Sequence, residues 1–140
     1  MTRVRAKRSG QSGGAAVEFA LVMPIFVAVL FGMIDYGWYF YQKFTLAAAI
    51  REGVRLGATI KSSATPGPAA RALTEAQNRC DAGSLPHAAV TWTSGMSADP
   101  APLQAVWVTG VYTFHPLVGL VPMPHSNMTY TMQMLLEQQY

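Results

Sequence analysis

Charged side chains are scarce in this chain of 140 residues. Asp, Glu, Lys and Arg together make up 12% of it, against about 25% in an ordinary soluble domain. Hydrophobic residues make up 51%. So little charge over so much apolar sequence predicts a membrane protein. The length suffices for one domain with a modest core.

Cysteine is almost absent. The single Cys80 excludes an intramolecular disulfide, and one thiol cannot assemble a zinc site. We interpret Cys80 as a buried or bystander thiol, with an intermolecular bridge as the alternative.

Sequence patterns of catalysis are also missing. Residues 10–14, GQSGG, form no phosphate loop, because no Gly-Lys-Ser/Thr follows them and no strand precedes them. No serine stands in a nucleophile elbow. The histidines His87, His115 and His125 are irregularly spaced, and we predict surface residues with no Cys or carboxylate near them. We therefore expect no enzyme, no catalytic residue, no metal and no cofactor.

The net charge of +3 does not indicate nucleic-acid binding, because the cations are concentrated at the N-terminus. Arg3, Arg5, Lys7 and Arg8 are four of the ten Lys and Arg residues. Beyond residue 13, six cations face seven carboxylates. A nucleic-acid-binding domain normally keeps its basic patch on the folded part, so no nucleic-acid partner is expected.

The N-terminal third divides into a leader and a long helix. Residues 1–13 are basic and then Gly/Ser-rich, which predicts a disordered leader peptide. Residues 14–60 carry helical periodicity without a break. Within them, residues 15–34 are apolar apart from Glu18, and 20 helical residues match a hydrocarbon core of about 30 Å. Pro24 is expected to bend or locally open this span.

Aromatic residues follow the span at once. They are amphipathic rings that favour the headgroup layer, and we predict a membrane-interface belt of Tyr36, Trp38, Tyr39, Phe40 and Tyr41. Asp35, at the same boundary, is expected to be a solvated interfacial carboxylate.

The second half of the long helix is amphipathic. Apolar residues recur at helical spacing in the stripe Ala47, Ile50, Val54 and Ala58. We expect this stripe to be buried against a sheet formed by the rest of the chain, because a sheet of two or three strands needs such a partner.

Residues 61–140 predict a small α/β head. Pro68 opens a short helix over residues 68–80, and strand patterns rich in Val, Thr and aromatics cover residues 88–93, 103–114 and 128–136. The expected fold class is α+β and pilin-like: a long N-terminal transmembrane spine helix followed by a small antiparallel β-sheet head.

The charge distribution predicts the orientation. Four cations precede the span and only Lys43 closely follows it, so the N-terminus is expected in the cytoplasm and the head across the membrane. The large aromatic residues after the span offer no signal-peptidase site. The plausible cleavage site therefore precedes the span, at the pair Gly13-Gly14.

Gly13 to Phe19, GGAAVEF, resembles the processing motif of type IVb pilins: a glycine, four residues, then glutamate and an aromatic. The likeness extends to the TadE-like pseudopilins of the tad (tight adherence) pilus system. It is carried by AAVEFALVMPIF, by the acid-aromatic-glycine triplet Asp35–Gly37, and by residues 51–55, REGVR. The length favours TadE-like proteins over shorter major pilins and longer TadG-like proteins, with TadF-like proteins as a near neighbour.

This resemblance implies a minor pilin or pseudopilin in tad-pilus assembly, in adhesion and in surface attachment. Its partners would be a prepilin peptidase, other pilins and pseudopilins, the assembly platform in the bacterial inner membrane, and membrane lipid. The head would be periplasmic, and the protein would either enter the pilus or stay at its base. Processing would involve Gly13, Gly14, Glu18 and Phe19.

Glu18 is the predicted assembly contact. After cleavage it would be the fifth residue and would pair with the α-amine of Gly14 in a neighbouring subunit; snorkelling of a lone Glu18 to the interface is the alternative. A different class of protein also fits: an unprocessed single-span membrane protein with a small periplasmic binding domain.

Overall fold

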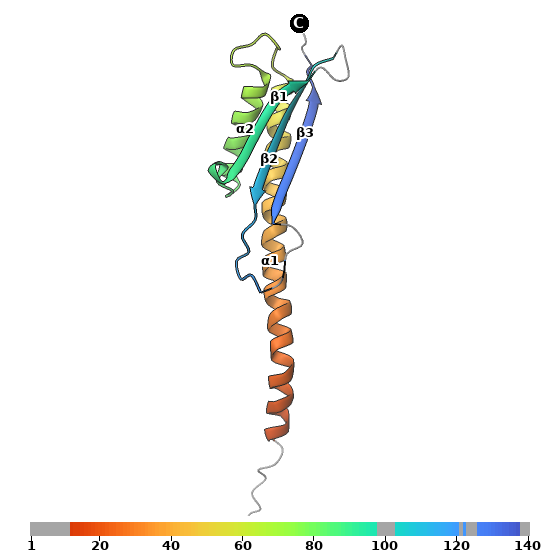
Figure 1. Cartoon of the computed structure of the whole chain (residues 1–140), viewed down its shortest axis with the longest axis vertical. Coiled ribbons are helices and arrows are strands. Elements are labelled where there is room, and N and C mark those ends of the chain that lie inside the picture. Colours follow the sequence, from red (N-terminus) through yellow and green to blue (C-terminus); the bar gives the residue numbers. More distant parts are fainter. Residues whose placement is uncertain (1–11, 98–102, 121, 123–125, 138–140) are drawn as a thin grey trace, which may run out of the picture.

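The computed structural model describes residues 12–97, 103–120, 122 and 126–137. Figure 1 shows one long helix with a small head at its C-terminal end. The elements, in chain order, are α1 (Ser12–Ala58), α2 (Pro68–Ala82), the 3-10 turn η1 (His87–Ala89), β1 (Val90–Ser97), β2 (Ala105–Thr113) and β3 (Asn127–Leu135). The expected α+β fold, with a spine helix followed by a three-stranded antiparallel sheet, is confirmed.

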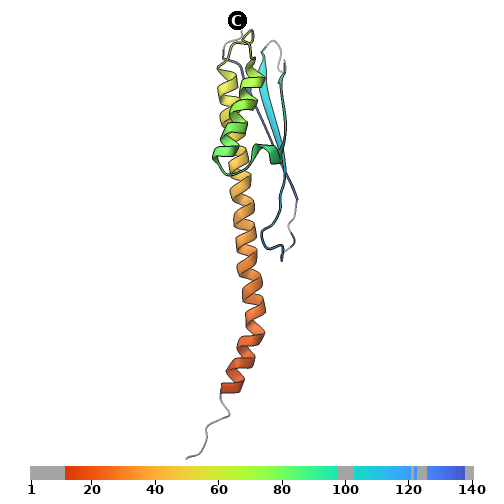
Figure 2. The ribbon, with the colours of Figure 1, turned by 90° about the vertical axis from the view of Figure 1, so that its left-hand side faces the viewer.

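The α1 helix is 47 residues long and continuous through Pro24. Figure 2 shows it curving gently toward its N-terminal end, so the proline does not interrupt it. In the described part of the chain, α1 is the one helix long and apolar enough to cross a membrane, and its most apolar stretch is almost entirely uncovered by the rest of the chain. This long apolar helix indicates a membrane anchor.

The sheet has the order β1-β2-β3, with both pairs antiparallel. Burial alternates along the central strand: Val106, Val108, Gly110 and Tyr112 are buried, while Trp107, Thr109 and Val111 between them are half-buried. Strand β1 continues four residues beyond its predicted end, because pairing persists through Gly95. Gly95 lies opposite Trp107 in the register, and a Cβ on it would come within 2.8 Å of the Trp107 ring.

Both helices lie on one side of the sheet (Figure 2), and the core fills the space between the layers. The predicted stripe on α1 is confirmed for Ile50, Val54 and Ala58, which are fully buried. Leu46 is buried in place of Ala47, which is only half-buried. Gly110 makes room for the helix, because a Cβ there would meet the Cδ1 atoms of Leu46 and Ile50 at 3.0 Å.

The α2 helix packs directly along α1, a contact the sequence did not predict. Small residues meet across it: a Cβ on Gly57 would lie 2.7 Å from the Ala72 Cβ, and a Cβ on Gly53 would lie 2.8 Å from the Ala76 Cβ. Ala72 and Ala76 are four residues apart on one buried face of α2. The glycines allow the two backbones to approach closely.

Candidate functional site

The N-terminal end of α1 carries the predicted processing site. Gly13 and Gly14 lie in the first turn of the helix and are exposed. A Cβ at either position would meet nothing within 4 Å. No described side chain outside the helix therefore packs against either glycine.

Glu18 follows Gly14 by one turn of the helix. It is exposed, and within the described part of the chain it makes no hydrogen bond or ion pair. Phe19 beside it is 64% exposed. The structure thus places both residues on an exposed apolar helix, where the described part of the chain supplies the carboxylate with no partner.

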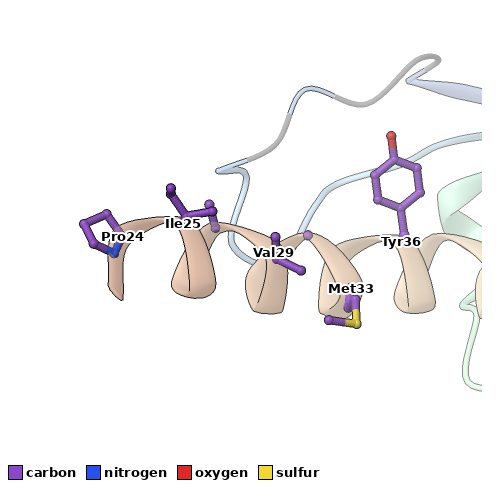
Figure 3. A pocket seen from close by; sticks show the side chains of 7 residues that line it. Pro24, Ile25, Val29, Met33 and Tyr36 are labelled. Atoms are coloured by element: carbon purple, nitrogen blue, oxygen red, sulfur yellow. The ribbon is translucent and has the colours of Figure 1, made fainter. Parts of the chain in front are cut away.

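Most of the remaining apolar span is uncovered as well, although Gly32 is buried. A shallow apolar groove runs along the span (Figure 3). The groove is lined by Pro24, Ile25, Ala28, Val29, Gly32, Met33 and Tyr36. No polar side chain except that of Tyr36 lines it, which suits contact with acyl chains or with another apolar helix.

The predicted aromatic belt contacts the head in part. The rings of Tyr39 and Phe114 meet edge to face, with centroids 5.2 Å apart. The Tyr41 hydroxyl donates to the Gly83 carbonyl at 3.1 Å, and its ring stacks on that of Trp38. Tyr36 is half-buried. These residues join the span to the head; their place at the membrane interface stays a prediction.

Asp35 is not the solvated carboxylate that we expected. Its side chain is completely buried under the connection between β2 and β3, which runs past the sheet along α1 (Figure 1). Asp35 Oδ1 accepts hydrogen bonds from the backbone N–H groups of Leu117 and Val118, at 3.0 and 2.9 Å. Its Oδ2 accepts one from the N–H of Gly119, at 2.9 Å.

The loop backbone is shaped to hold this carboxylate. Successive N–H groups converge on an anion when the chain turns into the left-handed region, a geometry known as a nest. Gly119 supplies that turn, with φ of +70°, which a residue with a Cβ adopts only with strain. A buried carboxylate is tolerated when charge-assisted hydrogen bonds replace its water. Asp35 is therefore buried and not exposed to solvent, because the N–H groups of the loop replace the water around its carboxylate.

The sequence carried a signal for this contact, but an incomplete one. Asp35 stood out as an acid at the end of an apolar span, and residues 115–127 lay between two of the predicted strands. No local sequence pattern links Asp35 to this loop, because more than eighty residues separate them.

Two of the three histidines are exposed, as expected, and His125 lies outside the described residues. One part of the expectation is wrong: His87 has a carboxylate beside it. Its Nδ1 lies 2.6 Å from Asp81 Oδ2, and its backbone N–H donates to Asp81 Oδ1 at 2.9 Å. These bonds lower the pKa of Asp81. No group of three or more potential metal-binding side chains occurs among the described residues.

Cys80 is buried in the core, as one of the two predicted alternatives had it. Burial, helped by the charge of Asp81, raises the pKa of its thiol to about 11. The protonated thiol packs in the hydrophobic core beneath α2 as a small apolar group.

Residues 13–55 match the family model of TadE-like proteins. Over these residues α1 is similar to TadE-like proteins. The expected resemblance is thereby confirmed over the residues that carried it, from Gly13 through Glu18 and Asp35 to Arg55. The match covers less than a third of the chain and ends before α2. No curated protein and no solved structure matches.

The TadE-like match associates the chain with the tad pilus system, whose TadE-like members are not known as enzymes. The matched residues include the exposed glycines, the lone Glu18 and the bare apolar helix.

Proposed function

We propose that this protein is a minor pilin or pseudopilin that acts in the assembly of a tad-type pilus, and so in adhesion and surface attachment. A prepilin peptidase cuts it between Gly13 and Gly14. The α1 helix anchors it in the bacterial inner membrane, with the N-terminus in the cytoplasm and the head in the periplasm. The TadE-like match over residues 13–55 supports this proposal, as do the cations before the span.

Cleavage at the glycine pair agrees with the local geometry. A peptidase must bring its catalytic groups to the carbonyl of Gly13, and exposed glycines leave that approach free of side chains. The new α-amine of Gly14 has an ordinary pKa near 8, so it is cationic or titrates near neutral pH.

The observation that carries the proposal is Glu18, an exposed acid on the apolar helix without a partner in the described chain. A carboxylate in a bilayer is costly until it is paired or neutralised. A second subunit, displaced along the helix axis, brings its Gly14 amine to this carboxylate. In a medium of low dielectric constant the pair is strongly favoured over two separate charges. Glu18 thus promotes assembly in one register.

The test is complementation of a deletion strain with Glu18→Gln. The variant should insert in the membrane normally but fail to restore pili or to co-purify with pilins. Glu137→Gln is the matched control, since Glu137 is an exposed carboxylate in the head whose backbone N–H donates to the Ala58 carbonyl, at the C-terminal end of α1. It should restore pili. Normal pili with Glu18→Gln would contradict the pairing role and favour snorkelling.

A further inference from the structure

Within the described part of the head, large exposed apolar side chains cluster in the loop that covers Asp35. Leu117 is 62% exposed, Val118 44% and Leu120 56%. No charged residue occurs between Phe114 and Ser126. Other large apolar side chains exposed on the described part of the head are scattered singly, such as Met96, Leu103 and Leu135, which is normal for a soluble surface.

The position of this loop along α1 is fixed by its hydrogen bonds. Asp35, which holds Leu117 to Gly119, is the first residue after the apolar span 15–34. The loop tip therefore lies level with the end of the span, whereas the sheet lies farther along α1 (Figure 1).

The loop also continues the apolar surface of α1. Ala28, Gly32 and Asp35 follow one another at spacings of four and three residues, so they share one face of the helix. Ala28 and Gly32 line the groove described above, and so does Tyr36, the neighbour of Asp35 in the sequence. The loop is thus seated at the head-side end of the groove.

We propose that the loop Pro116–Leu120 is a second membrane contact: it lies in the interfacial layer of the bilayer, where Leu117, Val118 and Leu120 touch phospholipid acyl chains. The loop then fixes the depth of α1 and the height of the head above the bilayer. The proposal rests on α1 spanning the membrane, and it depends neither on cleavage nor on pilus assembly.

The hydrogen bonds to Asp35 make such a contact possible. Irregular backbone is excluded from lipid because each unpaired N–H is costly there. Asp35 satisfies three consecutive N–H groups of this loop, so the tip approaches the hydrocarbon boundary without leaving them unpaired. Its remaining polar groups restrict the loop to the interface, short of the bilayer centre. Asp35 is a positioning residue in this arrangement.

The experiment uses the full chain in vesicles of phosphatidylethanolamine and phosphatidylglycerol, at low protein-to-lipid ratio. A spin label is placed at Leu120→Cys in a Cys80→Ala background, and its collisions with oxygen and with a polar nickel chelate are measured. Leu103→Cys is the matched control, because Leu103 is an exposed leucine before β2, at the other end of the sheet. A label at Ile25→Cys, within the apolar span, gives the collision values expected inside the bilayer.

The nickel chelate should collide with the label at position 120 severalfold less than with the label at 103, while oxygen collisions shift toward the value at position 25. Adding Asp35→Asn should raise the nickel collisions at 120 and leave those at 103 unchanged. Equal accessibility at 120 and 103 would overturn the proposal. So would protection at 120 that appears only at high protein-to-lipid ratio, since a second copy would then cover the loop. Because unprocessed protein serves equally well, failure here is separable from failure of the pilus proposal.

Discussion

Asp35 Oδ2 accepts a 2.9 Å hydrogen bond from the backbone N–H of Gly119, a residue 84 positions later. The bond joins the end of the apolar span to the loop between β2 and β3. It couples the two halves of the molecule at the level where the exposed apolar part of α1 ends and the folded head begins.

Asp35→Asn is expected to release this loop. An amide offers one acceptor oxygen and turns an N–H₂ donor toward the loop, so at least one of the three loop N–H groups loses its acceptor. Hydrogen exchange at the amides of Leu117 to Gly119 should accelerate by roughly tenfold or more, while the amide of Val108 in the central strand stays protected. Unchanged exchange at Gly119 would contradict the assigned contact.

Gly57→Ala and Gly37→Ala should have opposite effects on stability. In an unobstructed helix, Gly→Ala stabilises by about 0.5–1 kcal/mol, and a Cβ at Gly37 meets nothing within 4 Å. At Gly57 it would lie 2.9 Å from the Pro68 carbonyl oxygen, and overpacking costs about 1–3 kcal/mol. Thermal unfolding of the full chain in detergent measures both changes. A stabilising Gly57→Ala would disprove the close approach of α1 and α2.

The Cys80 thiol should react slowly while the protein is folded. It is buried, and with a pKa raised to about 11 it stays protonated at neutral pH, whereas the thiolate is the reactive form. Maleimide labelling at pH 7 should therefore require denaturant. Rapid labelling of the native protein would place the thiol outside the core.

Topology is best tested at another position, because Cys80 is inaccessible. Ser63→Cys in a Cys80→Ala background puts a thiol in the exposed connection between α1 and α2. An impermeant maleimide should label it in intact spheroplasts. Labelling that requires lysis would put the head in the cytoplasm and overturn the proposed orientation.

The head should need the second half of α1 to fold. Ile50 and Val54 are fully buried against the sheet and α2, and a three-stranded sheet alone has little core. A fragment of residues 61–140 should show no cooperative melting, whereas residues 36–140 should melt cooperatively. A stable, monomeric 61–140 fragment would contradict the role of α1 in the core.

Local periodicity was enough to predict the elements and the α+β class. The helical repeat that includes Ile50 and the alternation around Val108 each indicate which face is buried, because each pattern lies within one element. Contacts between distant segments were not predictable in this way. The fit of Gly57 against Ala72 depends on how two helices pack, and the burial of Asp35 depends on a loop that the chain reaches only after the second strand.

The candidate site was also predictable only where its residues are continuous in sequence. The glycine pair and Glu18 were identifiable because their motif is continuous in sequence. The loop at Leu117–Gly119 was missed because its function comes from backbone N–H groups, which every residue but proline carries.

The N-terminal residue of the protein in bacterial membranes tests the central claim most directly. Intact-mass measurement should give a chain that begins at Gly14. A Gly13→Leu variant should keep its full length, and its fold should be unaffected because a Cβ at position 13 meets nothing within 4 Å. A start at Gly14 is the result that processing as a pseudopilin predicts. A wild-type chain that begins at Met1 or Thr2 would contradict it and favour an unprocessed single-span protein, and cleavage after Gly14 would contradict the register that makes Glu18 the fifth residue.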